Sequence, residues 1–280
     1  MTQALVSVIM PTYNSAQWLS DSIDSVLNQT YKNLELIITD DCSTDGTHDI
    51  LKAYEQKDSR LKIIYAEKNV GAGHTRNKCI EHARGRYIAF CDSDDRWMPT
   101  KLEKQLMFMQ EKDCCMVFTS YITCDELGRN TGVIIAPRRQ NLFQTKCDDK
   151  IGFLTCIYDT EKTGGKMFMP VQRKRQDYAY VLQILQKCRY AYGIQEPLAY
   201  YRLHSESISA NKWSLIKYEM LTWRVVFGDS KIHSLLFFIF CFLPSYAWKK
   251  LQTWITNRKK NQYLNAIVQW TSQDYAFISY

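Results

Sequence analysis

The stretch GRYIAFCDSDDRW, residues 85–97, joins an apolar strand to an acidic turn. Its apolar part, Tyr87 to Cys91, is short and continuous, which predicts a strand buried on both faces. Asp92, Asp94 and Asp95 follow it directly. In open parallel sheets, ligands bind outside the carboxyl ends of the strands. The stretch therefore predicts a buried sheet with a ligand crevice along that edge.

Strand-sized apolar runs and amphipathic helical segments alternate through the first hundred residues. The predicted strands are residues 6–10, 34–39, 61–66 and 87–91, and the predicted helices are residues 15–29, 47–56 and 73–83. Such alternation predicts an α/β protein with a Rossmann-like, mostly parallel sheet flanked by helices. A helix over 99–112, a strand over 115–121 and a helix over 177–186 continue the pattern, whereas residues 128–172 lack regular periodicity.

Composition places this chain among globular proteins with a substantial core, because 46% of its 280 residues are hydrophobic. The first apolar run, residues 6–10, is too short for a signal peptide. Ten cysteines without a C-x-x-C pair predict buried free thiols in a reducing cytosol rather than a disulfide framework or a zinc site.

Three carboxylates within four residues, at Asp92, Asp94 and Asp95, are too close to remain ionised together without a cation. Hard divalent ions such as Mg²⁺ or Mn²⁺ take oxygen ligands and complete their shells with substrate phosphates and water. The alternative is that these acids cap the next helix, because Asp is a preferred cap residue. A second acidic pair after another strand, Asp40 and Asp41, favours the metal site.

Glycines at positions 71 and 73 open a predicted helix whose first turns carry His74 and Arg76. A helix N-terminus and a guanidinium together suit a diphosphate. A turn with two glycines and a surface arginine fits this segment equally well. The sequence contains neither G-x-G-x-x-G after the first strand nor a P-loop signature.

Six segments in this order resemble family 2 glycosyltransferases of GT-A fold. They are VSVIMPTYNS (6–15), DDCSTDGT (40–47), NVGAGHTRN (69–77), GRYIAFCDSDDRW (85–97), RQDYAYVLQILQK (175–187) and EPLAYYRLHSESIS (196–209). The resemblance covers about three quarters of the chain. It implies a nucleotide-sugar donor, usually a UDP-sugar, and inversion at the anomeric carbon.

The resemblance also implies roles for individual residues. The nucleotide-sugar would be bound by Pro11, Tyr13, Asp41, Arg76, Asp92, Ser93 and Asp94. In that set, Pro11, Tyr13 and Asp41 would frame the uracil and ribose, and Asp92 to Asp94 form the D-x-D element. A divalent cation, Mn²⁺ or Mg²⁺, would be held by Asp94 and Asp95, with His204 beside them. A lone histidine is more often structural, so a structural role for His204 stays open.

An inverting transfer needs one general base for the acceptor hydroxyl. The resemblance places this base at Asp177, the second residue of a pair that reads Glu-Asp in the family and Gln176-Asp177 here. The change puts any role of a second carboxylate in doubt. Taken without the family, Asp177 would be interpreted as a helix N-cap.

The C-terminal region has a different composition. We expect a catalytic domain over residues 1–210, with a nucleotide-sugar and metal half (1–112) and an acceptor half (113–210), followed by a basic, amphipathic helical region over 211–280. The last fifty residues contain six of the lysines and arginines and one acidic residue.

One apolar run in this region, Leu235 to Leu243, ends at Pro244 and is short of the roughly twenty residues that span a bilayer. Residues 246–255 place tryptophans and lysines as an interfacial helix does, which predicts a membrane surface bound through residues 231–260. A core helix or an oligomer contact are the alternatives. Nucleic acid is a poor fit, because the basic residues flank apolar surface.

Resemblance and C-terminal region together predict a peripheral enzyme on the cytoplasmic face of the inner membrane. It would add one hexose, glucose or galactose, to a saccharide on undecaprenyl diphosphate in bacterial O-antigen assembly. Single addition is expected because the Gln-x-x-Arg-Trp motif of processive synthases is missing. The alternative is an inactive nucleotide-sugar-binding scaffold, which Gln176 alone favours.

Overall fold

The computed structural model describes residues 4–170, 172, 174–204 and 212–251. The chain divides into two compact units, Met1–Lys231 and Ile232–Tyr280. The end of the last family-like segment, residues 205–209, and the basic residues after Leu251 lie outside the described residues.

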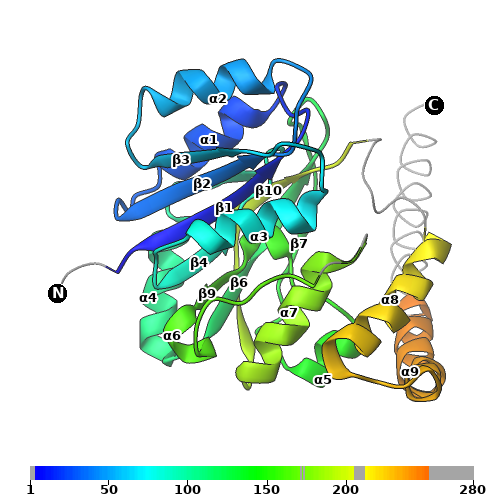
Figure 1. Ribbon diagram of the computed structural model, residues 1–280. Coiled ribbons are helices and arrows are strands. Elements are labelled where there is room, and N and C mark those ends of the chain that lie inside the picture. The colour runs from blue at the N-terminus through cyan, green and yellow to red at the C-terminus, as the bar shows by residue number, and fades with distance from the viewer. Residues whose placement is uncertain (1–3, 171, 173, 205–211, 252–280) are drawn as a thin grey trace, which may run out of the picture. The chain divides into compact units, whose positions relative to one another are not determined.

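Ten strands of the described residues form one sheet in the first unit, and its longest pairings are parallel (Figure 1). The strands are β1 (Val6–Thr12), β2 (Leu34–Asp40), β3 (Leu61–Tyr65), β4 (Tyr87–Phe90), β5 (Arg96–Trp97), β6 (Met116–Cys124), β7 (Asn130–Ile134), β8 (Arg139–Gln140), β9 (Ile157–Asp159) and β10 (Ala191–Arg202). The main path runs β3-β2-β1-β4-β9-β6-β10-β5. β9 pairs antiparallel with both β4 and β6 and so joins the two parallel parts.

The helices cover both faces of this sheet. In the first unit they are α1 (Leu19–Leu27), α2 (Thr47–Glu55), α3 (Ala72–His82), α4 (Lys101–Lys112), α5 (Leu142–Cys147), α6 (Thr160–Thr163), α7 (Gln176–Lys187) and α8 (Lys212–Phe227), with a 3-10 turn η1 (Phe153–Thr155). Helix α9 (Lys231–Phe237) begins the helix of the second unit. Side chains alternate along β1, so that Val8 packs with α1, α2 and α4, whereas Ile9 packs with α3 and α7. This two-sided burial explains the continuous apolar strands.

The four strands and four helices predicted for the first 112 residues are confirmed in their order, and the short strand β5 between β4 and α4 was not predicted. The first helix begins only at Leu19, because residues before it form a turn in which Trp18 N–H donates to the Ser15 carbonyl at 3.0 Å. The region 128–172, predicted as irregular, contains only short elements, of which β9 is a sheet strand of three residues. Runs this short carry no detectable periodicity.

The prediction that all cysteines are free thiols is wrong at one pair, because Cys115 and Cys188 form a disulfide. Cys115 precedes β6 and Cys188 follows α7, and the packing of α7 on the sheet brings their Cα atoms to 5.9 Å. A separation of 73 residues leaves no local signal in the sequence. The other eight cysteines are free, and six of them are buried.

Helix α8 belongs to the first unit, although its residues fall in the region that we assigned to the C-terminal segment. Trp223 is fully buried, and its indole N–H donates to the hydroxyl of Tyr178 in α7 at 2.9 Å. Thr222 accepts a hydrogen bond from the amide of Gln172, which lies just before α7. The first compact unit therefore includes α8 and ends at Lys231, whereas the domain boundary that we predicted lies at residue 210.

The second unit contains a continuous apolar helix. Lys231–Leu251 is a helix of 21 residues that is long and apolar enough to cross a membrane, as judged by length and composition. The prediction of a run too short to span, ended at Pro244, is therefore wrong. A π-helical turn, η2 (Phe238–Phe242), precedes Pro244 and widens the helix where the proline lacks an N–H. Ile232, Phe240 and Trp248 are largely exposed along it.

Candidate active site

The acidic turn after β4 is paired with an arginine from α3. Arg76 donates to a carboxylate oxygen of Asp92 at 2.6 Å and is itself buried. Burial opposes the positive charge of Arg76, but the carboxylates of Asp92, Asp177 and Asp94 outweigh it and raise its pKa. One buried guanidinium therefore interacts electrostatically with both the predicted donor side and the predicted base.

Hydrogen bonds hold the rest of this turn in place. The hydroxyls of Ser93 and Ser15 are 2.8 Å apart, and the Ser93 carbonyl accepts from the Ser22 hydroxyl at 2.9 Å. These contacts attach the turn to the segment between β1 and α1, through Ser15, and to α1, through Ser22. Ser93 therefore contributes to the shape of the site through its backbone as well as its hydroxyl.

Asp94 and Asp95 have different partners. A carboxylate oxygen of Asp94 lies 2.9 Å from Nε2 of His204. Asp95 is buried and accepts from the backbone N–H of Arg202 at 3.0 Å, while its other carboxylate oxygen has no hydrogen-bond partner among the described residues. Burial first, and the neighbouring carboxylates second, raise the pKa of Asp94 and raise that of Asp95 well above its usual range. Concentrated, under-neutralised carboxylates of this kind favour cation binding.

These residues fit a divalent cation that shares its shell with a diphosphate. Asp94 and His204 converge, and the unpartnered oxygen of Asp95 lies in the same acidic turn. Among the described residues, no cluster of three His, Cys, Asp or Glu side chains could hold a metal by itself. Substrate oxygens and water would have to supply the other ligands, as is usual for Mg²⁺. Neither Asp94 nor Asp95 caps α4, whose N-cap is Thr100.

Arg202 is a residue that the sequence analysis missed. Its backbone N–H binds Asp95, its Nε donates to the Asp94 carbonyl at 3.0 Å, and its Nη1 donates to the Glu126 carbonyl at 2.9 Å. Arg202 stands in the same family-like segment as His204, two residues before it, so a signal was present. A second missed residue is Trp18, whose ring stacks on His204 with centroids 5.3 Å apart.

The predicted nucleotide residues lie at the ends of β1 and β2. Pro11 is buried within β1, whereas the ring of Tyr13 is half exposed. Both oxygens of Asp41 accept backbone N–H groups, from Val70 at 2.8 Å and from Gly71 at 2.7 Å. Gly71 adopts a positive φ of 86°, which suits glycine. Asp41 thus holds the loop that leads into α3, in addition to any contact with a nucleotide.

Asp177 lies in the first turn of α7 and is partly exposed. Its side chain makes no hydrogen bond or ion pair with the residues that the structure describes. The N-cap of α7 is Arg175, so the N-cap interpretation of Asp177 is wrong. The adjacent Gln176 packs against Gly73 of α3, where an added Cβ would lie 2.8 Å from the Gln176 amide carbon. Gly73 therefore permits α3 and α7 to approach.

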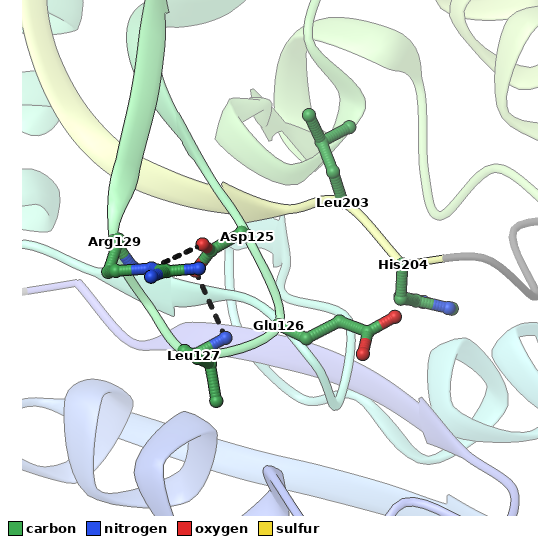
Figure 2. Close-up of a pocket in the computed structure, with 6 residues that line it drawn as sticks. All are labelled: Asp125, Glu126, Leu127, Arg129, Leu203 and His204. Atoms are coloured by element: carbon green, nitrogen blue, oxygen red, sulfur yellow. Dashed lines mark hydrogen bonds and ion pairs between the residues drawn. The ribbon is translucent and has the colours of Figure 1, made fainter.

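A cavity of about 420 Å³ opens beside His204 (Figure 2). Its lining residues are Asp125, Glu126, Leu127, Arg129, Leu203 and His204. The loop between β6 and β7 is braced by an Asp125–Arg129 ion pair of 2.7 Å, and Figure 2 shows Glu126 extending from this loop toward His204. The cavity therefore adjoins the Asp94–His204 pair and combines charged groups with exposed leucines.

The fold is the GT-A fold of glycosyltransferases. TarS of S. aureus, solved in complex with UDP, aligns with a TM-score of 0.61 at 20% identity, covering 82% of this chain and 68% of that chain. The mannosyltransferase PcManGT of Pyrobaculum calidifontis, solved with GDP-Man and Mn²⁺, aligns with a TM-score of 0.62 at 16% identity, covering 88% and 74%. These similarities establish the fold.

Residues 7–167 match the family model described as Glycosyl transferase family 2, and the chain belongs to this family. It is 46% identical over 230 residues to TuaG of Bacillus subtilis (strain 168), a candidate glycosyltransferase of teichuronic acid biosynthesis, covering 82% of this chain and 90% of TuaG. It is 38% identical over 209 residues to WfaP of Escherichia coli, covering 75% and 81%. WfaP is named as a UDP-Glc:alpha-D-GlcNAc-diphosphoundecaprenol beta-1,3-glucosyltransferase.

Proposed function

We propose that this chain transfers one hexose, glucose in the first instance, with inversion from a UDP-sugar to a saccharide on undecaprenyl diphosphate, in the assembly of a bacterial surface polysaccharide such as O-antigen. The observation that carries the proposal is that the buried guanidinium of Arg76, which pairs with Asp92 at 2.6 Å, also interacts with the charges of Asp177 and Asp94. Among the residues that the structure describes, Asp177 has no side-chain partner of its own. The name of WfaP, which is 38% identical to this chain, supports the donor and the acceptor.

The donor half of the site would hold the nucleotide and its diphosphate. Tyr13 offers an exposed aromatic face to a base, and Asp41 keeps the loop at Gly71 in position. Asp94, Asp95 and His204 would hold a divalent cation, Mn²⁺ or Mg²⁺. When bound, this cation supplies positive charge to the departing diphosphate.

The acceptor half would deprotonate the incoming hydroxyl. The hydroxyl oxygen forms a bond to the anomeric carbon while the bond from that carbon to the diphosphate oxygen breaks, and UDP leaves with the bonding electrons. The hydroxyl proton passes to the carboxylate of Asp177. A carboxylate without a protein partner suits this role, because its lone pairs are available to the acceptor.

A direct assay tests the proposal. The full-length protein is incubated with UDP-glucose, Mn²⁺ and GlcNAc-diphosphoundecaprenol, and we expect a lipid-linked disaccharide with a β-glucosidic bond, identified by mass and by NMR of the released sugar. UDP-galactose in a parallel reaction tests donor choice. Binding of UDP without consumption of either donor by any lipid-linked acceptor would contradict the proposal and support the scaffold alternative.

We also propose that residues 231–260 bind the membrane surface and keep the enzyme on the cytoplasmic face of the inner membrane. The described part of this region exposes large apolar side chains along its length, including Ile232, Phe240 and Trp248. Each lysine near its ends would contribute roughly 1 kcal/mol to the free energy of binding to an anionic leaflet.

A chain that ends at Lys231 should lose this association and keep its chemistry. We expect the full chain to sediment with anionic vesicles and the shortened chain to remain in the supernatant. Turnover on a short-chain, water-soluble acceptor should stay within about threefold of the full chain, because the first unit keeps α8 and its contacts. Equal sedimentation of the two chains would refute the membrane role.

A further inference from the structure

A buried ion-pair network lies at the start of α7, outside the residues assigned so far. Arg175 precedes α7 in a left-handed conformation, with a φ of 63°. Its guanidinium is 2.6 Å from a carboxylate oxygen of Glu219 in α8 and 3.9 Å from one of Asp149. It also lies over the ring of Tyr178, at 4.3 Å. Two carboxylates and an aromatic ring thus fix the position of this guanidinium.

This arginine stands two residues before the proposed base. The charge of Asp177 acts on Arg175, Asp149 and Glu219, so all four groups share one electrostatic environment. Arg175 nevertheless forms ion pairs with Asp149 and Glu219 and none with Asp177. A guanidinium released from these partners, two residues from Asp177 in the sequence, would have the Asp177 carboxylate as an available partner, since guanidinium–carboxylate pairs are strong.

A contribution to folding stability does not explain this ion-pair network well. Glu219 is buried, and within the described part of the chain neither its second carboxylate oxygen nor Nε of Arg175 has a hydrogen-bond partner. Burial raises the pKa of Glu219 to about 7 and that of Asp149 to about 6, so desolvation is only partly offset by Arg175. Buried pairs of this kind are often neutral or unfavourable compared with apolar residues of similar size.

We propose that Glu219 and Asp149 are positioning residues, which hold the guanidinium of Arg175 away from Asp177 and leave that carboxylate free to take the proton of the acceptor. The proposal rests on the proposed function. It makes α8 part of the catalytic unit, since α8 supplies Glu219 and is anchored to α7 by the hydrogen bond of Trp223 to Tyr178.

The first test is Glu219→Gln in the full-length protein. Arg175 then loses its main charged partner and can pair with Asp177, so kcat should fall roughly ten- to hundredfold, a part of what a general base contributes. The donor KM and the affinity for UDP should stay within about twofold, because the donor half is unchanged.

The matched control is Asp229→Asn. Asp229 follows α8 and pairs with Lys146 at 3.1 Å, with side chains as buried as those of the Arg175–Glu219 pair. We expect similar losses of melting temperature in both variants but a wild-type kcat for Asp229→Asn. A merely structural role of Glu219 would give the two variants the same kinetics.

A double variant separates the mechanisms further. Replacing both partners, Arg175→Met with Glu219→Met, removes the guanidinium that would occupy Asp177, so kcat should recover to within about fivefold of wild type. Arg175 lowers the pKa of Asp149, so its removal raises this pKa further from about 6 and favours the neutral form of Asp149. Independent structural losses would make the double variant worse than Glu219→Gln.

The outcomes decide the proposal. Wild-type kcat in a folded Glu219→Gln, or a double variant that is folded and no more active than Glu219→Gln, overturns it. Should Glu219→Gln fail to fold, the double variant alone is decisive, and an inactive, folded double variant overturns the proposal. Asp177→Asn separates the proposed function from the positioning role. If Asp177→Asn retains turnover, the proposed base is wrong. If only Glu219→Gln retains turnover, the positioning role is wrong.

Discussion

Asp177→Asn should lower kcat by about a thousandfold, within the range that general-base catalysis contributes, while the affinity for UDP stays unchanged. The amide keeps the shape of the side chain but cannot accept the proton of the acceptor hydroxyl. Asp177 makes no hydrogen bond or ion pair with any described residue, so the substitution breaks no structural contact. Steady-state rates with the lipid-linked acceptor and UDP titration by calorimetry measure the two quantities.

The neighbouring substitution Gln176→Glu is the control for this prediction. It preserves the size of the side chain that packs against Gly73 and restores the acidic pair of the family. We expect its kcat to stay within about fivefold of wild type, since no proton passes through this position. Turnover by Asp177→Asn at the rate of Gln176→Glu would exclude Asp177 as the base.

Asp94→Asn should reduce kcat by about a hundred- to a thousandfold, comparable to the loss of a group that stabilises developing charge. It should also abolish the strengthening of UDP binding by Mn²⁺. The substitution removes one negative charge from the acidic turn and changes the partner of His204, which lies 2.9 Å from the Asp94 carboxylate. UDP titrations with and without Mn²⁺ separate this effect from a general loss of affinity.

Asp125→Asn, at the rim of the adjacent cavity, is the matched control. It removes a carboxylate that pairs with Arg129 on the β6–β7 loop and leaves Asp94 and His204 intact. We expect UDP binding with Mn²⁺ to remain as in the wild type. An Asp94→Asn enzyme whose UDP affinity still rises with Mn²⁺ would show that the cation is held elsewhere.

The sheet could be predicted because its central strands are buried on both faces and the helices between them are amphipathic. Val8 and Ile9 point to opposite cores, so both positions must be apolar, and this leaves a continuous run in the sequence. β9 carries no such signal. Three residues between β4 and β6 complete the sheet only through tertiary contacts.

For the candidate site, we could predict which residues take part but not which other residues they contact. The family resemblance implied that Asp41 frames a nucleotide, which stays a prediction, and only the fold reveals that both of its oxygens accept backbone N–H groups from Val70 and Gly71. Contacts over long separations were equally hidden, as for Cys115 with Cys188 and for Arg202 with the acidic turn. Such pairings depend on strand order, which local spacing does not encode.

Arg202 has a consequence for recombining this enzyme with its relatives. Its backbone N–H and guanidinium donate to the acidic turn at Asp94 and Asp95, and the guanidinium also donates to Glu126 in the β6–β7 loop. Arg202 therefore connects these two segments, although it lies more than a hundred positions after the acidic turn in the sequence. A chimera that exchanges residues 1–112 alone would place a foreign acidic turn against a native β10. We therefore expect donor preference to transfer to a chimera only when the segment around Arg202 is exchanged together with residues 1–112. The two segments have to be exchanged as a pair.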